Sequence, residues 1–386
     1  MFSKNIKFKI FQFKIKKKDL KEELKFILKN NTELIKSLGK NYKNNYDLKK
    51  IKKLTKNTDL RLVGIGGSIL GAQAIDSFLQ NKIKNRFTFI DNLITKKKIK
   101  SKKKVTNLII SKSGNTLETI INSNILITKK DKNIFITEKK NSYLRELAQK
   151  LKAEILNHNN FIGGRYSVLS EVGMLPAELM GLNVNKFRQL NNLIKDKFFL
   201  NSLMSNVSAI IDLHEKKIYN SVIINYDPKS DYLFKWYQQL VAESLGKKSK
   251  GILPIISNMP KDNHSVMQLY LDGFKKNFFT FFFVKEKKSI YLNKKILLSS
   301  HKFYSDIKIN DILYNQKIAT ENIFFKKKIP YRSFELDDRN EDILGKLFIF
   351  FILETILVGR ALNINPFDQP SVELIKNESK RLFIQK

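Results

Sequence analysis

The chain has 386 residues, of which 42% are hydrophobic, so it can bury a large core in two domains or in one large α/β unit. It has no cysteine and four histidines, which excludes disulfides, thiolate catalysis and zinc–thiolate sites, and we expect no structural metal. A net charge of +36 alone would suggest nucleic acid or an anionic membrane as the partner. The excess is mainly lysine spread over the whole chain, as in the runs at 96–98, 102–104 and 326–328, where we expect solvated loops. No nucleic-acid-binding motif accompanies it, so we expect it only to attract small anions.

We expect a cytoplasmic protein, because the sequence shows neither a signal-peptide pattern nor a segment long enough to cross a membrane. No apolar core typical of a signal peptide follows the first residue. Ile6, Phe8 and Ile10 alternate with polar residues, which predicts a half-exposed strand. The most apolar segment, Leu347 to Val358, is too short to cross a bilayer and contains Glu354, so we predict a core helix there.

Short apolar segments alternate with helical patterns in two regions of the chain. After a helical start at 19–38, we expect strands at Leu60–Ile65, Phe87–Ile90, Val105–Ile110 and Ile134–Thr137; after a helical stretch at 185–214, we expect strands at Val222–Ile224, Ile252–Ile255 and Phe279–Val284. The alternation predicts an α/β fold with two doubly wound parallel sheets flanked by helices. We place the boundary near residue 200, so that residues 1–200 form the first unit. Residues 201–386 form the second, with a closing helix from Leu344 to Leu362.

Two loops at predicted strand ends favour an anionic ligand. The strand at Val105–Ile110 runs into a turn that offers three hydroxyls, a glycine and one positive charge: Ser111, Lys112, Ser113, Gly114 and Thr116. A helix from Leu117 would point its free N–H groups at this turn, which suits a phosphate, although the hydroxyls could instead only cap the helix. An earlier strand ends in the glycine turn at 66–68, which lacks the full dinucleotide-binding spacing. Because parallel strands end at one edge of a sheet, both loops would lie there.

Four further stretches carry polar residues suited to catalysis. They place Arg165 after a glycine pair, Gln239 and Glu243 on one face of an apolar helix, His264 at a helix start, and Gln369 and Lys376 beside a proline. Arg165 cannot lose its charge and could stabilise an oxyanion. Glu243, with little solvent around it, would suit a general base; the alternative is an exposed residue paired with Lys247. A single histidine such as His264 could equally be structural.

Taken in this order, these stretches resemble the phosphoglucose isomerase family, in its bacterial type, over roughly residues 60 to 380. The matching segments are LVGIGGSILG (62–71), SKSGNTLET (111–119), GGRYSVLS (163–170), ESLGK (243–247), HSVMQ (264–268) and NPFDQPSVE (365–373). The resemblance implies two sugar-isomerase (SIS) domains, a homodimer and no metal or organic cofactor. It also implies the interconversion of glucose 6-phosphate and fructose 6-phosphate, a reaction of glycolysis and gluconeogenesis.

The resemblance assigns a role to each residue of the site. The substrate-binding residues would be Ser68, Ser111, Lys112, Ser113, Thr116, Gly164, Gln239 and Gln369. Glu243 would move a proton between C1 and C2 through a cis-enediol(ate), and Arg165 would stabilise the charge of that intermediate. His264, supplied by the other subunit, and Lys376 would act in ring opening. The chain departs from the family at two positions: Ser371 replaces a glycine, and Glu171 replaces a small residue or proline.

Two alternatives compete with this interpretation. A non-catalytic sugar-phosphate sensor with two SIS domains would keep the serine-rich turn. It would have no reason to keep Arg165, Glu243, His264 and Lys376 together. The isomerase module of an amidotransferase is disfavoured because such enzymes use an N-terminal cysteine, and this chain has none.

Overall fold

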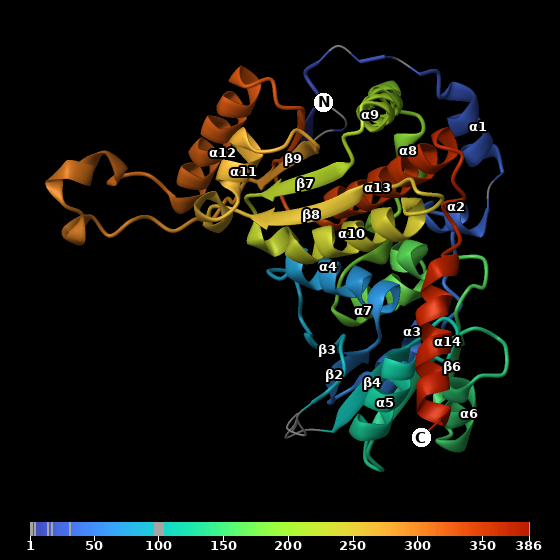
Figure 1. Cartoon of the computed structure of the whole chain (residues 1–386). Helices are drawn as coiled ribbons and strands as arrows, with labels where there is room; N and C mark the ends of the chain where they lie inside the picture. Colours follow the sequence, from blue (N-terminus) through green and yellow to red (C-terminus); the bar gives the residue numbers. More distant parts are fainter. Residues whose placement is uncertain are drawn as a thin grey trace.

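The computed structural model describes residues 3, 5–13, 15–16, 18–30, 32–95 and 104–385 (Figure 1). The lysine runs predicted as loops at 96–98 and 102–104 lie outside these residues, apart from Lys104. The run at 326–328 forms the exposed end of a helix and the turn after it, so it is only partly a loop.

The first sheet is wholly parallel, with the order β3-β2-β4-β5-β6. Its strands are β2 (Asp59–Val63), β3 (Phe87–Ile90), β4 (Val105–Ile110), β5 (Lys132–Thr137) and β6 (Glu154–Asn157). Four of them were predicted; β6 was not, because only Leu156 of its four residues is buried. On one face lie α5 (Leu117–Leu126) and α6 (Tyr143–Lys150), and on the other α4 (Leu70–Phe78) and α7 (Glu171–Leu179).

The second sheet has the order β1-β10-β9-β7-β8 and is parallel except for β1. Its strands are β1 (Ile6–Lys9), β7 (Asn220–Asn225), β8 (Leu253–Asn258), β9 (Asn277–Val284) and β10 (Tyr331–Leu336). The strand predicted at the N-terminus is confirmed, but it pairs with β10. The assignment of residues 1–200 to a single first unit is therefore wrong for this strand.

Helices cover both faces of the second sheet. The helices α9 (Lys197–Glu215), α10 (Asp231–Leu245) and α13 (Glu341–Ala361) lie on one face, and α11 (Met267–Asp272) and α12 (Ile309–Lys326) on the other. The predicted core helix is α13, most of whose residues are buried. Among the described residues, no helix has the length and apolar character needed to cross a membrane. The predicted α/β architecture, with helices around two mainly parallel sheets, is confirmed.

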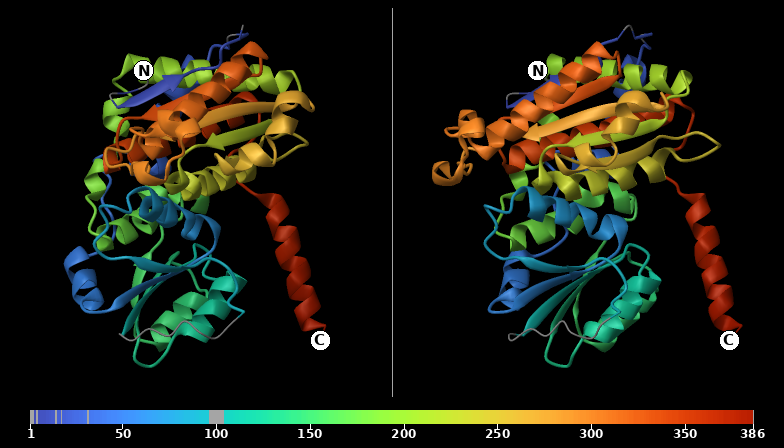
Figure 2. Two further views of the ribbon diagram at one scale, coloured as in Figure 1. Left: turned by 90° about the vertical axis from the view of Figure 1, so that its left-hand side faces the viewer. Right: turned by 60° about the vertical axis from the view of Figure 1, so that its left-hand side comes forward.

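The two units share one core at the contact between α10 and α4, in the middle of Figure 1. The remaining helices are α1 (Lys21–Lys29), α2 (Glu33–Ser37), α3 (Leu48–Thr55), α8 (Leu190–Leu193) and α14 (Pro370–Ile384). In Figure 2, α14 leaves the second unit and runs alongside the first without packing into it. None of its described residues is buried.

Candidate active site

The serine-rich turn follows β4 and leads directly into α5, as predicted. The Ser111 hydroxyl lies 2.8 Å from the Thr116 hydroxyl and accepts a 3.2 Å hydrogen bond from the Gly114 N–H. Gly114 has φ +68°, and an added methyl group would lie 2.1 Å from the Ser142 Oγ, so only glycine fits here. Thr116 is the N-cap residue of α5 but makes no side-chain cap. Its hydroxyl is turned into the loop, which argues against a purely capping role.

Two other predicted residues of this turn are engaged at its rim. The Ser113 Oγ accepts a 3.2 Å hydrogen bond from the Asn115 N–H. The Lys112 ammonium donates to the Asn160 carbonyl at 2.9 Å and lies 3.5 Å from the Glu138 carboxylate. Lys112 therefore ties the turn to the loop at 158–163, which leads into the Arg165 segment.

The two glycine turns lie against each other. Ser68 ends a short 3-10 helix, η1 (Gly66–Ser68), and Gly164 begins another, η2 (Gly164–Leu169). A methyl group on Gly67 would lie 2.2 Å from the Gly164 carbonyl carbon, so the two backbones can approach only because Gly67 has no side chain. This contact brings the predicted residues Ser68 and Gly164 to one place beside the end of β4.

Arg165 is the most heavily engaged residue of the site. Its side chain is 2% exposed, and its backbone carbonyl accepts a hydrogen bond from the Trp236 indole at 3.2 Å. Its five N–H groups donate to Ser244 Oγ (2.8 Å), Glu243 Oε1 (3.0 Å), Gln369 Oε1 (2.9 Å) and the carbonyls of Pro366 (2.7 Å) and Asp368 (3.1 Å). All five donors of the guanidinium are thus used, which fixes its position.

Glu243 is held between Arg165 and Gln239. Its second oxygen accepts a 2.9 Å hydrogen bond from the Gln239 amide, and its side chain is 24% exposed, so it is less enclosed than its apolar helix suggested. Among the described residues, the Gln239 Oε1 is buried and has no hydrogen-bond partner. The alternative pairing with Lys247 is wrong: α10 ends at Leu245, and the Lys247 ammonium bonds the Asp368 carboxylate at 2.6 Å instead.

The structure does not bring His264 to this cluster within one chain. His264 is exposed and ends η5 (Lys261–His264), which follows β8. Asn258, at the end of β8, bonds Asp231 at 3.4 Å. Asp231 and Glu243 lie near opposite ends of α10, about 18 Å apart along its axis.

Lys376 also lies outside the cluster. It is on α14, its side chain is 60% exposed, and its ammonium pairs with Glu373 at 2.7 Å. Gln369, the N-cap residue of the same helix, reaches Arg165, but Lys376 lies about two turns further along.

Several residues of the cluster were not predicted. The Ser244 hydroxyl receives Arg165 and lies 2.9 Å from the Tyr166 hydroxyl, which donates to the Pro366 carbonyl at 2.9 Å. Ser244 and Tyr166 are sequence neighbours of Glu243 and Arg165, and this adjacency is the one signal that could have indicated them. Trp236 shows no such signal, because its role depends on the contact between α10 and η2.

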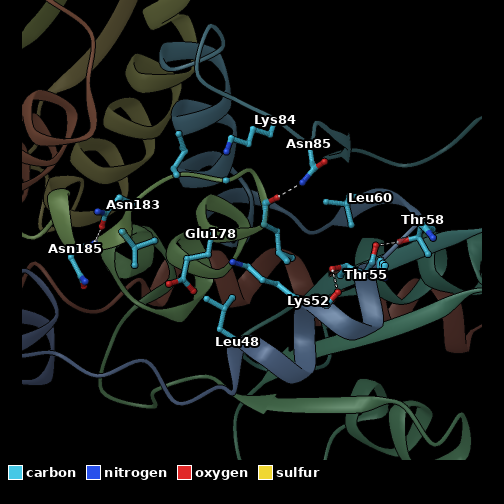
Figure 3. A pocket seen from close by; sticks show the side chains of 16 residues that line it. Leu48, Lys52, Thr55, Thr58, Leu60, Lys84, Asn85, Glu178, Asn183 and Asn185 are labelled. Atoms are coloured by element: carbon cyan, nitrogen blue, oxygen red, sulfur yellow. Dashed lines mark hydrogen bonds between the residues drawn. The ribbon is translucent and has the colours of Figure 1, made fainter.

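A polar cleft of about 830 Å³ lies elsewhere, between α3 and the C-terminal end of α7 (Figure 3). It includes none of the predicted site residues, and its lysines, such as Lys52 and Lys84, are exposed. In Figure 3, Lys52 reaches toward Glu178 on the opposite wall. Within the described part of the chain, no three or more His, Cys, Asp or Glu side chains are grouped to hold a metal ion.

Known proteins and a protein-family model match this chain over most of its length. The family model described as "Phosphoglucose isomerase" matches residues 35–385. A glucose-6-phosphate isomerase from Methanocaldococcus jannaschii is 33% identical over 362 residues, covering 88% of each chain. Among solved structures, a hypothetical protein from Thermus thermophilus has a TM-score of 0.81 at 21% identity, covering 94% of each chain. A glucose-6-phosphate isomerase from Chlamydia trachomatis has a TM-score of 0.70 at 18% identity, covering 94% of this chain and 73% of that one.

Proposed function

The chain belongs to the phosphoglucose isomerase family, and we propose that it interconverts glucose 6-phosphate and fructose 6-phosphate. The observation that carries this proposal is the Glu243 carboxylate, which is fixed by Arg165 and Gln239 at a surface that remains partly open. The glycine turns connect this carboxylate to the hydroxyl turn after β4. A phosphorylated sugar can thus be anchored at one end and deprotonated at the other.

The phosphate is bound by the turn that carries Ser111, Ser113 and Thr116, together with the N-terminal end of α5. The hydroxyls and free N–H groups supply donors, and the helix dipole favours negative charge. Lys112 contributes its charge from the rim, and Ser68 lies beside the end of β4. The sugar then extends toward Gly164 and Gln239, whose unpaired Oε1 suits a hydroxyl of the substrate.

Glu243 acts as the general base. It takes the proton from C2 of the open-chain aldose and returns it to C1, through a cis-enediol(ate). Arg165 is already oriented when negative charge develops, which is the most effective form of electrostatic stabilisation. Because all five of its N–H groups are occupied, a direct bond to the intermediate requires one of the five acceptors, such as Gln369, to release its N–H group.

We further propose a homodimer in which each site receives His264 from the partner. Within one chain, His264 is exposed and lies toward the far end of α10 from Glu243, so a second copy is the simplest source of a histidine for ring opening. Exposed apolar side chains on α14, including Leu374, Ile375 and Phe383, suit burial against that copy. The same packing would carry Lys376 toward a site.

Other features of the proposal follow from its chemistry. The two α/β units would both be of the SIS type. The proton transfers described use side chains alone, and we assign no cofactor. Because both substrates are charged sugar phosphates, which do not cross membranes unaided, we propose a cytoplasmic enzyme. No nucleic acid is needed as a partner.

The direct test is a coupled assay that follows glucose 6-phosphate formation from fructose 6-phosphate without added metal. We expect turnover that saturates with substrate. The competing sensor would bind the sugar phosphate, as seen by calorimetry, and give no product. That result would replace the enzyme with a regulator.

The shared site has its own test. Chains carrying His264→Ala and chains carrying Glu243→Gln should each have low activity, and mixing and refolding them should restore part of the wild-type activity. The reason is that some mixed dimers contain one site with both residues intact. Verified mixed dimers without activity would show that each site uses its own histidine.

A further inference from the structure

The carboxylate of Glu171 is fully buried, although the mechanism makes no use of it. Glu171 is the first residue of α7 and follows η2, the segment that carries Arg165. One oxygen accepts a 2.7 Å hydrogen bond from the Asn159 N–H, and the other a 3.1 Å hydrogen bond from the Tyr42 hydroxyl. A buried carboxylate is costly unless it is hydrogen-bonded, and here both oxygens have donors at a helix N-terminus.

The bond to Asn159 fixes the loop at 158–163. The carbonyl of the next residue, Asn160, accepts the hydrogen bond from Lys112 in the phosphate-binding turn. At its other end, the loop runs through Gly163 into Gly164 and Arg165. Glu171 therefore holds the segment that joins the phosphate-binding turn to the arginine beside Glu243.

The bond to Tyr42 ties this corner to the N-terminal region. The Tyr42 carbonyl accepts a 3.0 Å hydrogen bond from Arg188, whose guanidinium lies 5.0 Å from the Tyr42 ring centre. Arg188 also donates to the Leu169 carbonyl at 3.0 Å. Burial and the neighbouring Glu171 raise the pKa of Tyr42, so its hydroxyl stays protonated and donates. Tyr42 and Arg188, which contact each other, thus hold Glu171 and Leu169 respectively.

We propose that Glu171 is a positioning residue that sets the distance between the phosphate-binding turn and Arg165. This proposal rests on the isomerase function proposed above. It gives a role to a charged residue that is fully buried beside the site. Because the Tyr42 hydroxyl donates to Glu171, the N-terminal region also helps to position the site.

The chain contains a matched control on the same helix. Glu178 lies two turns further along α7 and accepts a 2.6 Å hydrogen bond from the Tyr46 hydroxyl. It lines the cleft of Figure 3, and its bond does not involve the 158–163 loop. The two tyrosine–glutamate pairs differ in whether they hold the loop and also in burial, because Glu171 is fully buried and Glu178 is only partly buried.

The experiment compares Glu171→Ala with Glu178→Ala in the coupled assay. We expect Glu171→Ala to lower kcat/KM by about 10- to 100-fold and to raise KM for fructose 6-phosphate. The reason is that the phosphate-binding turn and Arg165 would no longer be at the right distance to contact the same substrate molecule. Glu178→Ala should stay within about twofold. Glu171→Gln, whose amide oxygen can still accept from Asn159, should recover most of the activity. Equal kinetics for the two alanine variants, or no recovery by glutamine, would overturn the proposal.

A second readout does not depend on activity. Trp236 is the one tryptophan of the chain and donates to the Arg165 carbonyl, so its fluorescence reports on this segment. We expect Glu171→Ala to shift the emission maximum and Glu178→Ala to leave it unchanged. If Glu171→Ala does not fold, Tyr42→Phe and Tyr46→Phe replace the two alanine variants. If the wild-type protein has no isomerase activity but Glu171→Ala still shifts the emission maximum, the isomerase function is rejected and the positioning role is kept. If the wild-type protein is active and Glu171→Ala changes neither fluorescence nor turnover, only the positioning role is rejected.

Discussion

At both sheets, loops follow the carboxyl ends of parallel strands, but the two sets of loops differ in their side chains: hydroxyls at the first sheet, and carboxylates paired with an arginine at the second. At the first edge, β4 is followed by hydroxyls, a glycine and the N-terminus of α5. At the second edge, β7 is followed by Asp227, whose carboxylate accepts a 2.9 Å hydrogen bond from Arg339. Arg339 also donates to Glu286 at 2.7 Å, and its guanidinium lies 5.0 Å from the Phe78 ring on α4. The second edge thus supplies its own cation, and through Phe78 that cation also contacts the first unit.

This difference shows that topology determines where a ligand can bind, and the loops determine whether it does. Ligands of open α/β sheets bind at the carboxyl ends of strands, and both edges meet that condition. At the first edge, the N-terminus of α5 receives no side-chain cap from Thr116. The second edge pairs its carboxylates with internal cations. Function therefore has to be argued from the side chains of a site.

The largest expected effect comes from the carboxylate that we propose as the general base. Glu243→Gln should lower kcat by about 10²- to 10⁴-fold with KM nearly unchanged, because a general base contributes that much. Asp231→Asn, near the other end of α10 and facing the second edge, is the matched control and should change kcat less than about threefold. Steady-state kinetics measure both, and a Glu243→Gln enzyme with most of its turnover would remove this residue from the mechanism.

Breaking the ion pair of the second edge should reduce stability and spare catalysis. Arg339→Met leaves the buried Asp227 carboxylate without its main partner, so the free energy of unfolding should fall by about 3–5 kcal/mol. Urea denaturation measures the loss. Arg381→Met, which removes an exposed ion pair with Glu378, serves as the control and should leave the midpoint unchanged. A change in KM of the folded Arg339→Met protein would contradict the division between the two edges.

Removing one hydroxyl from each edge should separate binding from stability. Ser111→Ala should raise KM for fructose 6-phosphate by about 10- to 100-fold, the value of one hydrogen bond to a charged group. Ser230→Ala, which removes a buried hydroxyl bonded to Asp227, should lower Tm and leave KM unchanged. Equal KM values for the two variants would place the phosphate away from the serine-rich turn.

The smallest expected effect is a pH dependence of stability near the first edge. Burial lowers the pKa of His158, so the unfolded chain binds this proton more readily than the folded chain does. The contribution to stability is complete above about pH 6.5 and is lost as the pH falls toward the folded pKa, by at most about 1.4 kcal/mol per pH unit. His158→Asn should reduce this slope in urea titrations from pH 7.5 to 5.5. The same slope in both proteins would exclude His158 as its source.

The sequence was most informative where a short strand ends in an apolar run. The strands β3 and β4 were predicted with their observed bounds, because Phe89 and Ile90 end the one and Leu108 to Ile110 end the other, although both strands also contain polar residues. β10 was missed because it contains Arg332 and Glu335. Arg332 is buried because it pairs with Glu354 of α13 and donates hydrogen bonds to Thr280 and Asn206, and such partners cannot be identified from local sequence.

The candidate site was predictable in its parts and much less so in its arrangement. Residue types and resemblance indicated Arg165, Glu243 and the serine-rich turn. They did not indicate that Arg165 uses all five donors, because two of these reach backbone carbonyls at 366 and 368. The alternative pairing of Glu243 with Lys247 failed because helical spacing applies only within a helix, and α10 ends before Lys247.

The pairing of β1 with β10 affects the order in which the protein can fold during synthesis. Ile6 is made well before Leu336, its partner in the sheet, so the pairing has to wait until the chain between them has been made. Until then, the first strand has no neighbour along its edge, and afterwards the edge of β10 stays unprotected until β1 arrives. The second sheet therefore gains β1 as its edge strand only after the whole segment from β1 to β10 has left the ribosome.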